Sequence, residues 1–290
     1  MNISLLCRLF GKSRQAYYQQ KTIIVSQQQR TKLILDSVDS YRAVWPRLGC
    51  LKLHALLQAE LGREITRGRD SFLALLRRNG YTLPMIKRHH TTNSNHIYRK
   101  YPNLVKGIAP QNVNHILVSD ITYIFIQGDV LYLHLVTDAY SHAIIGYCLS
   151  DTLEAEHTIK ALEMAIQNAG GGNLCGTIHH SDRGVQYASD RYVSLLMEHH
   201  IRISMTEDYN PTDNAIAERI NGILKSEALY PMGQLPDREQ AEEVVNRLID
   251  FYNHKRPHMS IGNLVPWDVY IGAVPHENLW KKKPQLKENV

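Results

Sequence analysis

The chain has 290 residues, 43% of them hydrophobic and 21% charged, a composition that excludes a disordered or fibrous protein. No segment approaches the roughly 18 consecutive apolar residues of a membrane helix, and Arg8 and Lys12 interrupt the start before a secretory signal could form. We therefore expect a soluble cytoplasmic protein with no membrane partner. A disulfide framework or a cysteine zinc site is not expected, because no C-x-x-C pair occurs among Cys7, Cys50, Cys148 and Cys175.

Charge is distributed unevenly along the chain. Residues 1–110 contain 19 Lys and Arg against 5 Asp and Glu, a net charge of +14, whereas residues 111–290 contain 14 against 23, a net charge of −9. The basic part is typical of a protein that binds a polyanion, because each phosphate neutralised by Lys or Arg releases counterions. The acidic part would repel DNA unless cations intervened.

The N-terminal region is predicted to be helical. A short helix near residues 5–10 ends at Gly11, and Ser13 can cap the helical turn that follows, which together suggest a small helix-turn-helix. We assign residues 1–38 to this N-terminal helical segment.

Two further helices are expected in the next region. The leucine pattern predicts one over residues 51–61 that ends at Gly62, and another that is capped by Thr66 and ends at Gly80. We assign residues 39–95 to a helix-turn-helix-like DNA-binding region and residues 96–111 to a linker. The candidate DNA contacts in this region are Arg67 and Arg69.

The residue pattern changes after residue 111. Runs rich in β-branched and aromatic residues predict three consecutive antiparallel strands over 115–126, 130–140 and 142–149. A helix over 154–169, a strand over 177–180, a helix over 189–198 and a strand over 201–205 follow. This order predicts an α/β domain over residues 112–272, a mixed sheet with helices packed on it, followed by a basic tail over 273–290.

Two carboxylates in this domain are candidates for an active site. Asp120 lies inside the apolar run HILVSDITYIFI, so we expect it at an open end of the sheet or bound to a cation, because burying an unpaired charge is costly. Asp182 follows the strand predicted over 177–180, and chain that leaves a sheet often lines an active site. Each carboxylate alone is more often a cap or a surface charge, so the combination carries the hypothesis.

A third carboxylate, Glu218, lies in a predicted helix with the sequence NPTDNAIAERINGILKSE. At about 100° per residue, the isoleucines of this segment share one face, and Glu218 and Lys225 share the opposite face with Asn221 between them. A carboxylate on that face can hold a metal ion while the Lys225 ammonium reaches a phosphate nearby. We therefore include Lys225 and Asn221 among the candidate DNA contacts.

Hard oxygen ligands without a matching Cys or His set favour Mg²⁺ or Mn²⁺ over zinc. Two such ions about 3.5–4 Å apart can activate an attacking oxygen and stabilise a leaving oxygen. We therefore predict a phosphoryl-transfer site with two ions, which requires the three carboxylates to meet at one place.

Three sequence segments support a family assignment: HSDRGVQYAS, NPTDNAIAERINGILKSE and YNHKRPHMSIGNLVPWDVY. Together they resemble the IS-three family of bacterial insertion-sequence transposases, in particular the catalytic protein of their second reading frame, within the retroviral integrase superfamily. The resemblance implies a ribonuclease-H-like fold preceded by all-α helix-turn-helix DNA-binding segments. It also implies that Asp120, Asp182 and Glu218 form the metal-binding triad and that Lys225 contacts donor-end DNA.

The resemblance extends to partners and departs at three positions. It implies DNA substrates, namely element ends and target DNA, a homo-oligomer on paired ends, an upstream-frame protein as a possible fusion partner, and a place near the bacterial nucleoid. The family usually has Trp at the position of Leu117, Gly at that of Tyr209 and Tyr at that of Thr212. We expect Leu117 to change packing, not chemistry, whereas Tyr209 would strain the loop before Glu218 if that position needs a positive φ.

Other basic residues and other functions remain as alternatives. Arg183 suits a phosphate but could pair with an acid, and Lys255 and Arg256 are candidate DNA contacts. We expect His179 and His180 to pack instead of binding metal. A DNA-binding repressor without catalysis and a nuclease that only hydrolyses stay open as alternatives to a transposase.

Overall fold

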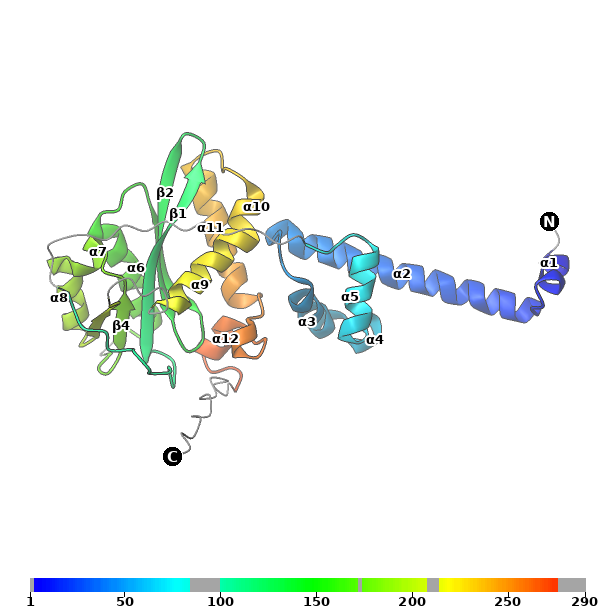
Figure 1. The fold of residues 1–290 in the computed structure, drawn as a ribbon, viewed down its shortest axis with the longest axis horizontal. Helices are drawn as coiled ribbons and strands as arrows, with labels where there is room; N and C mark the ends of the chain where they lie inside the picture. Colours follow the sequence, from blue (N-terminus) through cyan, green and yellow to red (C-terminus); the bar gives the residue numbers. More distant parts are fainter. Residues whose placement is uncertain (1–2, 84–99, 172–173, 208–213, 276–290) are drawn as a thin grey trace, which may run out of the picture. The chain divides into compact units, whose positions relative to one another are not determined.

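The computed structural model describes residues 3–83, 100–171, 174–207 and 214–275 (Figure 1). The chain divides into two compact units: Met1–Ala43 with Leu48–Pro84, here the helical unit, and Val44–Arg47 with Met85–Val290, here the sheet unit. Within the described residues, no helix has both the length and the apolar content that crossing a bilayer needs.

The helical unit begins with α1 (Ile3–Leu9) and α2 (Arg14–Val44). Gly11 has a φ of 64°, and the Ser13 hydroxyl accepts a hydrogen bond of 3.0 Å from the Ala16 amide, so Ser13 caps α2 as predicted. However, α2 has 31 residues instead of a single turn. The boundary that we placed after residue 38 therefore falls inside one continuous helix.

Three shorter helices complete this unit: α3 (Cys50–Leu61), α4 (Arg63–Thr66) and α5 (Arg69–Arg78). The predicted helix over 51–61 is confirmed. The prediction that Thr66 caps the next helix was wrong: Thr66 ends α4, and its hydroxyl donates to the Gly62 carbonyl, while Gly68 precedes α5. The unit is held together by buried residues of α2, α3 and α5: Ile34, Val38, Leu53, Leu57, Phe72 and Leu76.

The sheet unit has five strands: β1 (Ile116–Ile126), β2 (Asp129–Asp138), β3 (Ile144–Ser150), β4 (Ile178–Ser181) and β5 (Arg202–Met205). Their order is β3-β2-β1-β4-β5, with β1, β2 and β3 antiparallel and with β4 and β5 parallel to β1. The mixed sheet flanked by helices confirms the predicted fold class, including the three antiparallel strands at its start.

Two long helices cover opposite faces of the sheet: α6 (Ala155–Asn168) and α11 (Arg238–His254). A Cβ atom on Gly146 in β3 would lie 2.1 Å from the Ala161 carbonyl oxygen of α6, whereas the Tyr147 hydroxyl donates to Asn246 of α11. Because neighbouring strand residues point to opposite faces, this pair places the two helices on either side. Glycine at 146 is needed for α6 to lie this close to β3.

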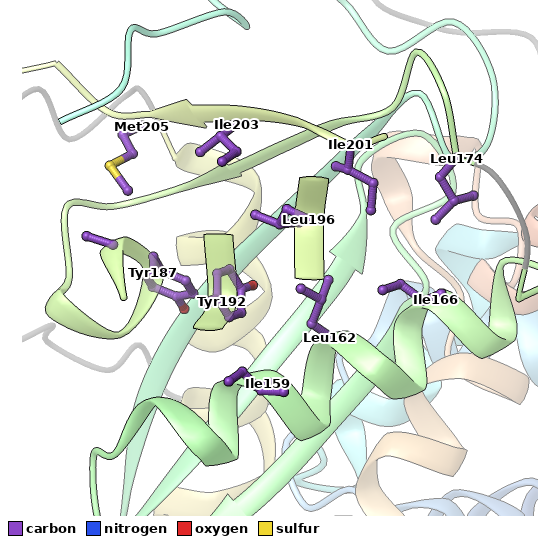
Figure 2. Packing of buried hydrophobic residues seen from close by; sticks show 11 residues of the cluster. Ile159, Leu162, Ile166, Leu174, Tyr187, Tyr192, Leu196, Ile201, Ile203 and Met205 are labelled. Atoms are coloured by element: carbon purple, nitrogen blue, oxygen red, sulfur yellow. The ribbon is translucent and has the colours of Figure 1, made fainter. Parts of the chain in front are cut away.

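The face under α6 is also covered by α7 (Val185–Ala188) and α8 (Asp190–Glu198). Figure 2 shows side chains of α6 and α8 meeting those of β5 in one hydrophobic cluster, which includes Ile159, Leu162, Tyr192, Leu196 and Ile203. The predicted helices over 154–169 and 189–198 are therefore confirmed, and their apolar faces form a core.

The remaining elements follow β5: α9 (Ala215–Ile223), a π-helix (Leu224–Leu229), α10 (Tyr230–Met232), α11, a 3₁₀ turn (Met259–Ile261) and α12 (Pro266–Tyr270). Leu117 of β1 is fully buried beside Val136, Ile145 and Tyr270, so it packs in the core as expected.

Candidate active site

Asp120 and Asp182 are brought together by two parallel strands. The paired segments of β1 and β4 end at Ser119 opposite Ser181, and each aspartate is the next residue along the chain. The carboxyl ends of parallel strands lie at the same edge of a sheet, where open α/β sheets bind ligands. We expected Asp120 at an open end of the sheet, but it lies inside β1, which continues beside β2 to Ile126; only the pairing with β4 ends just before it.

Helix α9 is attached to this same edge by two asparagines, one at its start and one near its end. The Asn214 side-chain amide donates a hydrogen bond of 3.0 Å to the Ser119 carbonyl, and the Asn221 amide donates one of 2.7 Å to Oδ2 of Asp120. Oδ1 of Asp120 accepts a bond of 2.9 Å from the Ile121 amide. The orientation of the Asp120 carboxylate is therefore fixed from both the strand and the helix.

The pKa of Asp120 is raised to about 7. Burial is the largest cause, followed by the negative charge of Asp182, and the charge of Glu218 adds to both, while the hydrogen bonds from Asn221 and Ile121 act in the opposite direction. The charges of Asp182 and Glu218 therefore both act on Asp120. A site that raises the pKa of an acid in this way is one where a bound cation would offset the repulsion.

Glu218 lies in the first turn of α9, and its side chain is exposed. Among the described residues, no three Asp, Glu, His or Cys side chains are grouped closely enough to hold one metal ion. Carboxylate oxygens are suitable ligands for a hard cation. In this structure, however, the three carboxylates are not close enough together to form a complete coordination site. Tyr209 and Thr212, in the segment before α9, lie outside the described residues.

Lys225 was predicted to share the helix face opposite the core with Glu218, but it is less exposed than Glu218. The helix changes to π geometry at Leu224, so the spacing of about 100° per residue no longer applies beyond it. Lys225 is half-buried, with its Nζ 5.8 Å from the centre of the Tyr123 ring, and burial lowers its pKa although the charge of Asp120 opposes this. Lys225 nevertheless lies close enough to Asp120 for the two charges to interact.

Comparison with known proteins identifies the family. The integrase core domain family matches residues 110–211, and a second integrase core domain family matches residues 199–266. An insertion element IS600 protein of 31 kDa from Shigella sonnei, described as uncharacterized, is 35% identical over 267 residues, which cover 90% of this chain and 96% of that protein. The chain belongs to the integrase-core family of insertion-sequence proteins.

Other members of this family are named as transposases. The putative transposase for insertion sequence element IS986/IS6110 of Mycobacterium tuberculosis is 34% identical over 164 residues, which cover 56% of this chain and 59% of that protein. The putative transposase InsK for insertion sequence element IS150 of Escherichia coli is 30% identical over 178 residues, with coverage of 58% and 62%. Against these two relatives, the alignment spans about three fifths of their length.

Solved integrases show a more distant similarity. The HTLV-2 integrase catalytic core domain in complex with magnesium is 21% identical and covers 55% of this chain and 97% of that chain, with a TM-score of 0.42. The simian T-cell lymphotropic virus intasome is 20% identical, covers 80% and 78%, and has a TM-score of 0.49. At these scores, the fold assignment rests on the strand order and direction in the sheet.

Two of the predicted DNA contacts in this family member have other roles. Asn221 is buried and donates to Asp120 because α9 packs on β1 along this face. Arg256 is 1% exposed and forms an ion pair with Glu227 of the π-helix, with Nη2 2.9 Å from Oε1, so it is not available to DNA here. The prediction of a DNA contact is thus corrected for both residues.

The other basic candidates lie on the surface or beside the carboxylates. Arg183 is half-buried next to Asp182, and Lys255 is exposed at the end of α11. Arg67 and Arg69 are exposed in the helical unit, where Arg69 forms an ion pair with Asp70. These four residues stay predictions. His179 and His180 are fully buried and hydrogen-bonded, the former to Ser119 and Tyr192 and the latter to Ser204.

Sequence reasoning missed the cluster that fixes the π-helix. The Trp45 indole donates a hydrogen bond of 3.0 Å to Oε2 of Glu227, the carboxylate that Arg256 also binds, and the Arg47 amide donates to the Glu227 carbonyl. Trp45 is fully buried and stacks on Phe251. The one sequence signal was that Glu227 and Arg256 each lie within a family segment, which alone does not indicate that they pair.

Proposed function

We propose that this protein is a DNA transposase of the IS-three family that cleaves the ends of a bacterial insertion sequence and joins them to target DNA. The observation that carries the proposal is the junction of β1, β4 and α9, where Asp182 and Glu218 both raise the pKa of Asp120. Membership in a family whose named members are transposases supports the same reaction class.

Asp120, Asp182 and Glu218 would hold two Mg²⁺ or Mn²⁺ ions. The chemistry that the ions supply is activation of the attacking oxygen and stabilisation of the leaving oxygen at a phosphodiester. The donor set fits hard cations, and the raised pKa of Asp120 reflects first its burial and then its repulsion by the other carboxylates, both of which a bound cation would offset. Asn221 and the Ile121 amide would keep the Asp120 oxygens oriented while it is ionised.

The reaction consists of two displacements at phosphorus. In the first, a water oxygen bonds to phosphorus at the element end while the bond to the 3′-oxygen breaks, which leaves a 3′-hydroxyl on the element. In the second, that hydroxyl attacks a target phosphodiester, a new 3′–5′ linkage forms, and the 3′-oxygen of the target strand leaves. The two steps need no covalent bond between protein and DNA.

Basic residues outside the triad would bind the phosphates. Lys225, whose charge interacts with that of Asp120, would contact the donor end, Arg183 would contact a phosphate near Asp182, and Lys255 would contact flanking DNA. The helical unit, with Arg67 and Arg69 exposed, would bind element ends through a helix-turn-helix. A homo-oligomer on paired ends and an upstream-frame fusion partner complete the proposal, together with a cytoplasmic location near the nucleoid.

The test is product analysis with oligonucleotides that carry the element end. With Mg²⁺, the wild-type protein should yield both cleaved and joined strands. Asp182→Asn should abolish both products and retain DNA binding, whereas Asp129→Asn, an exposed carboxylate at the β1–β2 turn, should leave them unchanged. Nicks without joined strands would indicate a nuclease, DNA binding without either product a repressor, and unchanged joining by Asp182→Asn would reject the assignment.

A further inference from the structure

Tyr187, in α7, has an unusual hydroxyl group. The residue is 2% exposed, and its buried hydroxyl has no hydrogen-bond partner among the residues that the structure describes. The neighbouring Tyr192 differs: its ring contacts that of Tyr187 edge to face at 5.6 Å, but its hydroxyl bonds to Nε2 of His179 at 2.9 Å. Buried polar groups without a partner are rare, and each one calls for a physical explanation.

The position of Tyr187 connects it to Asp182. A Cβ atom on Gly184 would lie 3.0 Å from Oδ1 of Asp182 and 3.4 Å from Cδ2 of Tyr187, so the carboxylate and the ring both lie close to this glycine. The pKa of Tyr187 is raised, first by burial and then by the charges of Asp182 and Asp120. The hydroxyl is therefore within the electrostatic field of both aspartates without bonding to either.

We propose that Tyr187 is a positioning residue whose hydroxyl donates a hydrogen bond to the Asp182 carboxylate when a divalent cation is bound there. This inference rests on the proposed function, because it needs Asp182 to be a ligand. A carboxylate that binds a cation is ionised and accepts hydrogen bonds strongly, and carboxylate ligands are usually held by such outer partners. Asp182 already accepts a hydrogen bond of 2.9 Å from the Gly184 amide, so cation binding would act by orienting the carboxylate so that one of its oxygens meets the Tyr187 hydroxyl.

Tyr187→Phe and Tyr192→Phe should have opposite effects on melting temperature and on Mn²⁺ affinity, because only the Tyr192 hydroxyl has a hydrogen-bond partner in the described structure. Tyr187→Phe removes a hydroxyl without a partner, so without cation the variant should melt at the same temperature as the wild type or higher. Its affinity for Mn²⁺ should be roughly ten- to hundredfold lower, which is the usual effect of losing an outer partner of a ligand. Tyr192→Phe removes a satisfied hydroxyl, so it should melt lower and bind Mn²⁺ normally.

The experiment measures Mn²⁺ affinity by electron paramagnetic resonance and melting temperature by circular dichroism in EDTA, on the full chain. Asp182→Asn defines the signal that belongs to this site. If wild type and Asp182→Asn bind Mn²⁺ equally, the cation site and this inference both fail. If Asp182→Asn loses binding but Tyr187→Phe retains wild-type affinity, only the role of Tyr187 is overturned, and the proposed function stands.

Discussion

The side-chain amide of Asn221 lies 2.7 Å from Oδ2 of Asp120, a hydrogen bond between residues 101 positions apart in the chain. It joins the helix that carries Glu218 to the strand that carries Asp120. The bond also favours the ionised form of Asp120 and so opposes the effects of burial and of the other carboxylates. Asn221 therefore acts on the site through Asp120, not through DNA.

Replacing Asn221 with leucine should raise the pKa of Asp120 further. A hydrogen bond to a charged group contributes about 1.5–3 kcal/mol, which corresponds to roughly one to two pKa units. Titration of the Asp120 carboxyl carbon by NMR measures this directly. Asn246→Leu, an exposed asparagine of α11, is the matched control and should leave the pKa at about 7. An unchanged pKa in Asn221→Leu would show that this hydrogen bond has no such effect.

Asp120→Asn should change how stability depends on pH. In the folded wild type, Asp120 keeps its proton up to about pH 7, whereas the ordinary pKa of an aspartic acid is 3.8, so the folded state binds more protons between these values. The free energy of unfolding should therefore fall as pH rises through this window, by at most about 1.4 kcal/mol per pH unit. Asp120→Asn lacks this loss. The free energy of unfolding of the variant minus that of the wild type should therefore be larger at pH 8 than at pH 5.

Urea denaturation in EDTA at the two pH values measures this difference. The control is Asp129→Asn, whose exposed side chain should leave the pH dependence of the wild type intact. Parallel pH dependence in Asp120→Asn and wild type would mean that Asp120 is ionised throughout this range.

Arg256→Ala should destabilise the sheet unit, because it leaves Glu227 without its buried partner. Removing one member of a buried ion pair typically costs about 3–5 kcal/mol, although Glu227 is partly exposed and the lower part of that range is expected. The adjacent Lys255→Ala is the matched control: its side chain is exposed, so stability should change by less than about 0.5 kcal/mol. Chemical denaturation compares the two, and equal stability would contradict a structural role for Arg256.

Much of the sheet could be predicted from the sequence, because each strand is marked by the residues within it. The runs of β1, β2 and β3 are rich in β-branched and aromatic residues, and glycine marks the end of α3, so periodicity and punctuation were sufficient. The length of α2 was not predicted, because its mostly polar, exposed residues give no strong periodic pattern.

The arrangement of the site was predictable only in part. The identities of Asp120, Asp182 and Glu218 came from spacing and resemblance, but the roles of Asn221 and Arg256 depend on what packs against them. The π-helix at Leu224 also changes the direction of Lys225, and it is stabilised by contacts of Glu227 that are distant in sequence. Projection onto an ideal helix could not detect any of these.

Lys225→Ala should weaken binding of element-end DNA and lower its dependence on salt. In a plot of the logarithm of the affinity against the logarithm of salt concentration, each phosphate contact contributes a slope of about −0.9. Loss of one contact should therefore make the slope less negative by about one. Titrations at several salt concentrations by fluorescence anisotropy measure it. Mn²⁺ affinity should stay unchanged, which separates this role from that of the carboxylates. An unaltered slope would show that Lys225 does not contact a phosphate.

Mn²⁺ bound to crystals of the full chain, located by anomalous diffraction, tests the central claim most directly. The account predicts anomalous peaks within coordinating distance of oxygens of Asp120 and Asp182, with the Glu218 carboxylate turned towards them. Under Mn²⁺ concentrations that support strand joining, the absence of a peak at these aspartates, or a peak held by other residues alone, would contradict it.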